Sequence, residues 1–187
     1  MEELKRYRNA FILLTLISAA GILTGLYLYE YTGFFASLRV DAEMLPISGF
    51  DAEELLSLFF NEARILALVF MLGFTLFAPY TASLILLYKG FMTGFSAVYF
   101  GLYYQKGSID KQSFVLICAS MVFLLLVYII TGAKSIAFSG SLRYAAPDLI
   151  SLLKRKPTGR YLVTFLVLCV FALISVTLKY SIPILKK

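Results

Sequence analysis

Five uncharged tracts separate the charged residues of this chain. They cover residues 9–29, 65–88, 90–105, 112–133 and 161–178. A helix that crosses the hydrocarbon core of a bilayer needs about 20 apolar residues, so three tracts are long enough and 161–178 lies near the lower limit. Because 60% of the 187 residues are hydrophobic, the chain has more apolar surface than a water-soluble core of this size buries. The sequence therefore predicts a membrane protein.

The region 65–105 is too long for a single span. As one helix it would extend for about 60 Å, roughly twice the thickness of the bilayer core. We expect a helix break at Pro79, because proline lacks an amide donor and clashes with the preceding helical turn. The fold class is then an all-α polytopic membrane protein with about five transmembrane helices, short loops and one amphipathic interfacial helix. We expect one integral membrane domain over 1–187, with spans at about 9–29, 64–79, 82–104, 112–134 and 161–180.

The distribution of charge predicts the orientation of these spans. Basic residues gather before the first span and in the loop 143–160, whereas the loop 30–62 is rich in aspartate and glutamate. By the positive-inside rule, the amino terminus and loop 143–160 lie inside, and loop 30–62 and the carboxyl terminus lie outside. The first apolar tract continues to Tyr29, so we expect a retained anchor rather than a cleaved leader.

Two extramembrane segments carry candidate contacts. Asp51 is suited to cap a helix in which Leu55, Leu58 and Phe59 share one face, so the segment 51–62 either lies on the membrane surface or leads directly into the second span. A re-entry helix and a docking site for a partner are both open interpretations of it. In the loop 143–160, the residues expected to contact anionic lipid headgroups are Lys154, Arg155 and Lys156.

The stretch 86–101 combines small and polar residues within an apolar region. Four small residues fall on one stripe of a helix and predict a helix-packing groove: Gly90, Gly94, Ala97 and Gly101. This groove meets either another helix of the same chain or a partner.

An intramembrane polar cluster lies beside that groove, formed by Lys89, Thr93 and Ser96. No carboxylate falls within the predicted spans to pair with Lys89, whose burial at a span centre costs about 3 kcal/mol. Three interpretations are open: Lys89 extends to the headgroups, bonds backbone carbonyls near Pro79, or lines a functional cavity.

The residue types disfavour catalysis. The chain has no histidine, and its two cysteines, Cys118 and Cys169, lie in separate apolar tracts. The serines of 135–141 have no evident base, so we expect them to support helix packing by bonding the preceding turn. We therefore expect no enzyme activity, no cofactor and no metal site. The basic residues flank spans rather than forming a separate patch, so no nucleic-acid partner is expected.

An ordered set of motifs resembles the stage II sporulation protein M family. It comprises Asn61, Gly73 ahead of Pro79, LLYKGFMTGFS at 86–96 and SIAFS at 135–139. The resemblance implies a multi-pass protein of a bacterial or archaeal cell membrane. It also implies a role in sporulation and engulfment, as a scaffold that holds peptidoglycan-remodelling hydrolases at the septal membrane.

The expected partners are other membrane-anchored proteins, including cell-wall hydrolases, and a second copy of the chain. If the resemblance carries over, Gly90, Gly94 and loop 30–62 are the surfaces that meet them. The alternative function is the membrane subunit of a small-molecule transporter or permease, because intramembrane polar groups and broken helices are typical of transporters.

Overall fold

The computed structural model describes residues 2–32, 52–107, 109–142 and 156–180. Within them lie five helices: α1 (Glu2–Thr32), α3 (Ala52–Leu72), α4 (Ala78–Gln105), α5 (Lys111–Leu142) and α7 (Lys156–Tyr180). Each contains a window that is long and apolar enough to cross a membrane. The prediction of an all-helical chain with five candidate spans is confirmed.

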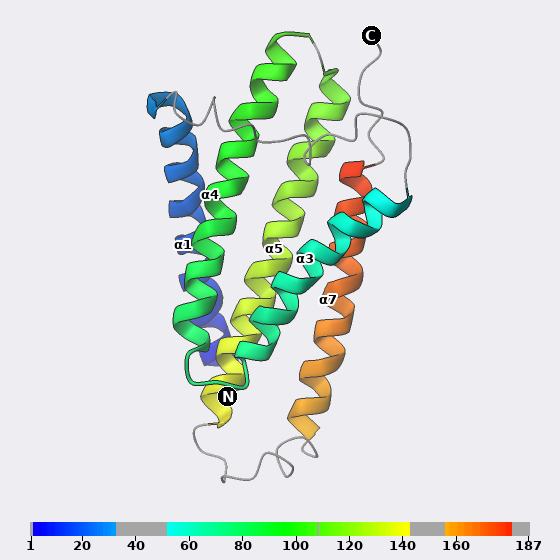
Figure 1. Cartoon of the computed structure of the whole chain (residues 1–187). Helices are drawn as coiled ribbons and strands as arrows, with labels where there is room; N and C mark the ends of the chain where they lie inside the picture. Colours follow the sequence, from blue (N-terminus) through cyan, green and yellow to red (C-terminus); the bar gives the residue numbers. More distant parts are fainter. Residues whose placement is uncertain (1, 33–51, 108, 143–155, 181–187) are drawn as a thin grey trace.

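Successive helices run in opposite directions, so α1 begins and α7 ends at opposite ends of the bundle (Figure 1). Helix α1 packs mainly on α4, while α5 lies at the centre and contacts all four other helices. Helix α3 crosses α5 obliquely, from the end of α7 to the start of α4 (Figure 1). The main core lies where α1, α3, α4 and α7 converge on α5, and Leu14, Leu66, Leu86 and Ala133 are buried in it.

The predicted groove of small residues on α4 is occupied by α1. A Cβ atom on Gly94 would collide with the carbonyl oxygen of Ile22, and one on Gly90 with that of Ser18. The contact is reciprocal, because Gly21 and Gly25 of α1 lie just as close to the backbone of α4. Small residues let membrane helices approach this closely. Gly90 and Gly94 therefore serve packing within the chain.

The other end of the stripe is different. Gly101 has no atom within 4 Å of where its Cβ would lie, and Ala97 is half-buried. The groove predicted over Gly90, Gly94, Ala97 and Gly101 therefore does not act as a single close contact.

Helix α3 is continuous from Ala52 to Leu72, so the amphipathic segment leads directly into the second span. It begins well before the predicted start at residue 64, and the predicted loop 30–62 is correspondingly shorter, because α1 also continues to Thr32. The remainder of that loop, 33–51, lies outside the described residues. So do Lys154 and Arg155 with most of the loop 143–160, and the side chain of Lys156, at the start of α7, is also not described.

The chain reverses between α3 and α4 over residues 73–77. The amides of Gly73, Phe74 and Thr75 each donate to the carbonyl three residues earlier, at 2.9–3.0 Å, which tightens the end of α3. Pro79 then lies in the first turn of α4, where its missing N–H removes no helical hydrogen bond. The break thus precedes Pro79, which was expected to end the second span and instead begins the third.

Helices α4 and α5 form a hairpin whose turn stands beyond the ends of α3 and α7 (Figure 1). A small apolar cluster holds the two arms together, with Phe100, Ile109 and Ile117 buried. Asp110 caps α5 by accepting hydrogen bonds from the amides of Gln112 and Ser113 at 3.1 and 3.3 Å. Bonds from the Ser113 hydroxyl and amide hold the pKa of the Asp110 carboxyl below its usual value.

The α1–α4 contact predicts a sharp difference between two glycines of one helix. Gly94→Ala places a methyl group against backbone atoms of Ile22 that cannot rotate away, and it should destabilise the protein by about 1–3 kcal/mol. Gly101→Ala meets open space and should be neutral or stabilise by up to about 1 kcal/mol. Unfolding followed by circular dichroism in mixed micelles checks both variants, and equal losses of stability would contradict the packing described.

Candidate functional site

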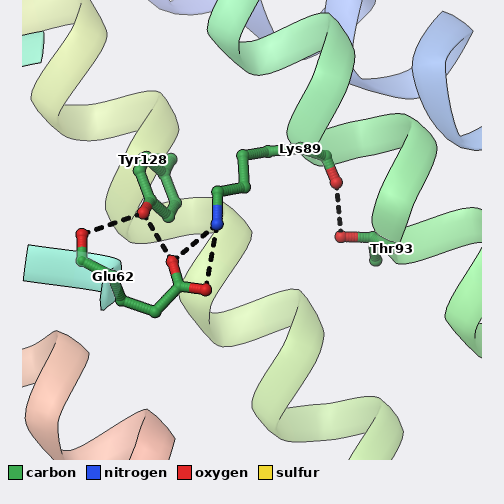
Figure 2. A network of polar contacts seen from close by, with 4 residues as sticks. All are labelled: Glu62, Lys89, Thr93 and Tyr128. Atoms are coloured by element: carbon green, nitrogen blue, oxygen red, sulfur yellow. Dashed lines mark hydrogen bonds and ion pairs between the residues drawn. The ribbon is translucent and has the colours of Figure 1, made fainter. Parts of the chain in front are cut away.

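A charged contact connects three helices inside the bundle. The Nζ atom of Lys89 on α4 donates to both carboxylate oxygens of Glu62 on α3, at 2.9 and 2.7 Å. The hydroxyl of Tyr128 on α5 lies 2.5 Å from Glu62 Oε2 and 3.1 Å from the Glu62 carbonyl oxygen. The Lys89 ammonium also lies 4.9 Å from the centre of the Tyr128 ring. Figure 2 shows this network.

The network corrects the expectation that no carboxylate in a span could pair with Lys89. Glu62 was assigned to the outside loop, but the early start of α3 brings it into the helix. Lys89 lies about 16 Å along α4 from Ala78, and its side chain turns towards Glu62 rather than bonding carbonyls near Pro79 or extending to the headgroups. Lys89 lines a cavity, as the third interpretation expected, and a function for that cavity stays a prediction.

A cavity of about 260 Å³ lies between α3, α4 and α5 at this network. The polar residues that line it are Asn61, Glu62, Tyr88, Lys89, Thr93, Ser96 and Tyr128. The three residues of the predicted polar cluster, Lys89, Thr93 and Ser96, therefore line one cavity. The Thr93 hydroxyl donates to the backbone carbonyl of Lys89 at 2.8 Å, and Ser96 is buried. Sequence reasoning missed Glu62 and Tyr128.

A second polar cluster secures the carboxyl-terminal end of α3. The Ser135 hydroxyl donates to the carbonyl of Val69 at 2.8 Å, and the Ser139 hydroxyl donates to that of Thr75. From α7, the Tyr161 hydroxyl donates to the carbonyl of Phe70 at 2.9 Å. Val69 and Phe70 lie in the last turn of α3 and Thr75 lies in the reverse turn that follows it. Side chains from two other helices therefore bond the backbone where α3 ends.

These bonds explain the SIAFS motif at 135–139. Its two serines lie four residues apart on one face of α5, where they reach successive parts of the α3 end. The expectation that these serines bond the preceding turn of their own helix is wrong for Ser135 and Ser139. Their hydroxyls are occupied in bonding the backbone, which fits a structural role.

Aromatic rings surround this second cluster. The Tyr161 ring stacks on those of Phe138 and Phe70, with ring centres 4.4 Å apart in both pairs. Gly73 makes room for it, because a Cβ atom there would collide with the Tyr161 hydroxyl and lie 2.9 Å from Ser135 Oγ. The Gly73 and SIAFS motifs thus meet at one contact.

The polar side chains of the described helices limit what these helices can bind. Within them, no group of three or more His, Cys, Asp or Glu side chains could hold a metal ion. Each buried polar side-chain atom described has a hydrogen-bond partner. What the Glu62–Lys89 network can do is bind: it presents an ammonium, a carboxylate and hydroxyl groups at one cavity wall.

Changes to the ion pair should be strongly non-additive. Glu62→Gln leaves the Lys89 charge without its counter-ion, and Lys89→Met does the same to Glu62, so each should destabilise the protein by about 3 kcal/mol. The double variant removes both charges and should lose much less than the sum. Thermal unfolding of all four proteins in the same bilayer mimetic measures the coupling, and additive losses would show that the two charges do not interact.

The contact between Gly73 and Tyr161 can be tested by a second double-mutant cycle. Gly73→Ala should destabilise the protein by about 1–3 kcal/mol, because its methyl group collides with the Tyr161 hydroxyl. Tyr161→Phe removes that hydroxyl and its bond to Phe70, for a loss of about 1 kcal/mol. Gly73→Ala should be better tolerated in the Tyr161→Phe background. An equal effect in both backgrounds, measured by chemical unfolding, would refute this account of Gly73.

Comparison with known proteins places these features in a family. The model of the family described as stage II sporulation protein M matches residues 10–178, which include all five spans except the start of the first. A search of curated proteins and a search of solved structures each found no match. The match covers the Glu62–Lys89 network, the close α1–α4 packing and the SIAFS contacts. The chain belongs to the stage II sporulation protein M family.

Proposed function

We propose that the protein is a non-enzymatic membrane scaffold that holds cell-wall hydrolases at the membrane. The observation that supports this most is family membership over residues 10–178. The described bundle is compatible with it, because the hydroxyls of Ser135, Ser139, Tyr161 and Ser175 donate hydrogen bonds between helices and to the turn after α3, which hold the helices together. Such a rigid bundle is suited to hold a partner in place.

The surface that meets the partner differs from the one expected. Gly90 and Gly94 are covered by α1 and are closed to another protein unless the bundle opens. The α4–α5 hairpin is better placed, because its turn projects beyond α3 and α7 (Figure 1). Its arms expose apolar side chains, among them Leu102 and Val115. We assign partner binding to this hairpin and place it on the outer side, with the amino terminus inside.

A matched pair of variants tests the scaffold. Leu102→Ala with Val115→Ala trims the hairpin surface, and Leu166→Ala with Val167→Ala trims an equally exposed surface of α7. In cells, a fluorescent membrane-anchored hydrolase should lose its septal enrichment several-fold with the hairpin variant and keep it with the α7 variant. Unchanged localisation in the absence of the whole protein would contradict the scaffold function.

The orientation has its own test. In a background with Cys118 and Cys169 replaced by alanine, a cysteine at Lys111 should react with a membrane-impermeant maleimide in intact cells. A cysteine at Lys5 should react only after the cells are permeabilised. The reverse pattern would place the hairpin inside and would exclude it as the contact for a cell-wall hydrolase.

A transporter subunit is the second candidate, and the cavity at Glu62 and Lys89 is the observation that favours it. Transporters bind their substrates at intramembrane polar groups of this kind. Uptake of a solute by proteoliposomes that is lost in the double variant Glu62→Gln, Lys89→Met would support this function over a scaffold alone.

A further inference from the structure

We propose that the cavity between α3, α4 and α5 binds a small zwitterion, a molecule that carries a primary ammonium and an anionic oxygen group close together. This binding function goes beyond the proposed scaffold and does not depend on it. The site consists of Glu62 and Lys89, with Thr93 and Asn61 beside them and apolar side chains around them.

The charges at the cavity wall determine the class of ligand. Glu62 and Lys89 form a pair without net charge, with 21% and 15% of their side-chain surface exposed. A ligand with a single charge is attracted by one member of the pair and repelled by the other. A zwitterion aligned antiparallel to the pair places its ammonium against the carboxylate and its anionic group against the ammonium, so both contacts are attractive.

Both charged side chains retain hydrogen-bonding capacity. A lysine ammonium has three N–H donors, and the contacts to Glu62 use two at most. Glu62 Oε1 accepts one described bond, from Lys89, although a carboxylate oxygen accepts two. The Thr93 hydroxyl donates to its own helix and still has lone pairs (Figure 2). A zwitterion can therefore bind beside the ion pair without breaking it.

The rest of the wall suits an apolar group on the ligand. Met92 of α4 and Met121, Leu124 and Leu125 of α5 also line the cavity. Methionine adapts to groups of different shape. The volume of about 260 Å³ is small for a drug-sized pocket and is sufficient for a molecule the size of an amino acid.

A contribution to the stability of the fold does not by itself explain why this ion pair is present. Replacing a buried ion pair by apolar residues of similar size is often neutral or stabilising. Ionisable residues within membrane spans are rare and are associated with function. Partial exposure of both charges to a cavity provides the means to bind something there.

Two sources supply this chemistry. One is a free amino acid with an apolar side chain, and the other is the ethanolamine phosphate headgroup of a phospholipid. We distinguish them with full-length protein in nanodiscs of phosphatidylcholine and phosphatidylglycerol. L-leucine is titrated into these nanodiscs, and a parallel preparation contains phosphatidylethanolamine in place of phosphatidylcholine.

Saturable binding of L-leucine, seen by calorimetry and as a raised unfolding temperature, is expected if the free zwitterion is the ligand. Its single-charge analogues, 3-methylbutylamine and 4-methylpentanoate, should bind at least tenfold more weakly. A rise in unfolding temperature with phosphatidylethanolamine alone would identify the lipid headgroup as the source. No effect of either zwitterion, or equal binding of a single-charge analogue, would overturn the proposal.

Variants locate the site. Glu62→Gln with Lys89→Met should weaken zwitterion binding at least tenfold without leaving an unpaired charge. Met92→Trp fills the cavity while keeping the ion pair, and should also abolish binding. Because the native chain has no tryptophan, fluorescence of this residue independently reports whether the variant is folded. Undiminished binding in a folded Met92→Trp variant would overturn the assignment to this cavity.

Discussion

The position of helix α3 depends on side chains that bond across helices, above all on the contact of Glu62 with Lys89 and Tyr128. Lipid is as apolar as leucine, so burial of apolar surface does little to hold membrane helices together. Helix α3 crosses the bundle obliquely and is fixed at two levels (Figure 1). The ion pair secures its middle, and hydroxyl groups from α5 and α7 secure its carboxyl-terminal end.

The contact between α1 and α4 is of a different kind. Helices α1 and α4 meet backbone to backbone at reciprocal glycines, where side chains are absent on both sides. This contact holds α4 against α1, while the turn of the α4–α5 hairpin extends beyond α3 and α7 (Figure 1). The bundle therefore combines a closely packed α1–α4 contact, a projecting hairpin and a polar cavity. We propose the hairpin as the surface for a partner and the cavity as a separate site for a small ligand.

The sequence was most informative where one local property determines the structure. Long uncharged tracts gave five helices, and the four-residue spacing of Gly90 and Gly94 identified a packing surface. Gly21 and Gly25 have the same spacing in the first tract, so the partner helix could also have been found. The sequence was less informative about contacts between distant segments. The SIAFS motif itself does not indicate that its two serines bond the backbone at and just after the end of α3, which lies 64 and 66 positions earlier in the sequence.

Glu62 shows why the central site was only half predicted. Its charge and its acidic neighbours placed it in a loop, since a span of about 20 apolar residues normally excludes such a side chain. Lys89 in the following helix was itself a signal that a counter-ion should be sought among the nearest acidic residues, and Glu62 is that counter-ion. Tyr128 lay within a continuous apolar tract, where only the tertiary structure distinguishes it from other aromatic residues.

The most direct test of this account measures the Glu62–Lys89 contact in a bilayer. Solid-state NMR can recouple ¹³C in glutamate carboxyl groups with ¹⁵N at lysine Nζ, in full-length protein labelled at both residue types. We predict strong dephasing of one carboxyl signal, and we expect this dephasing to be lost in the Lys89→Met variant. Absence of dephasing in the native protein, or dephasing that persists in the Lys89→Met variant, would contradict the position of α3 and with it the proposed cavity.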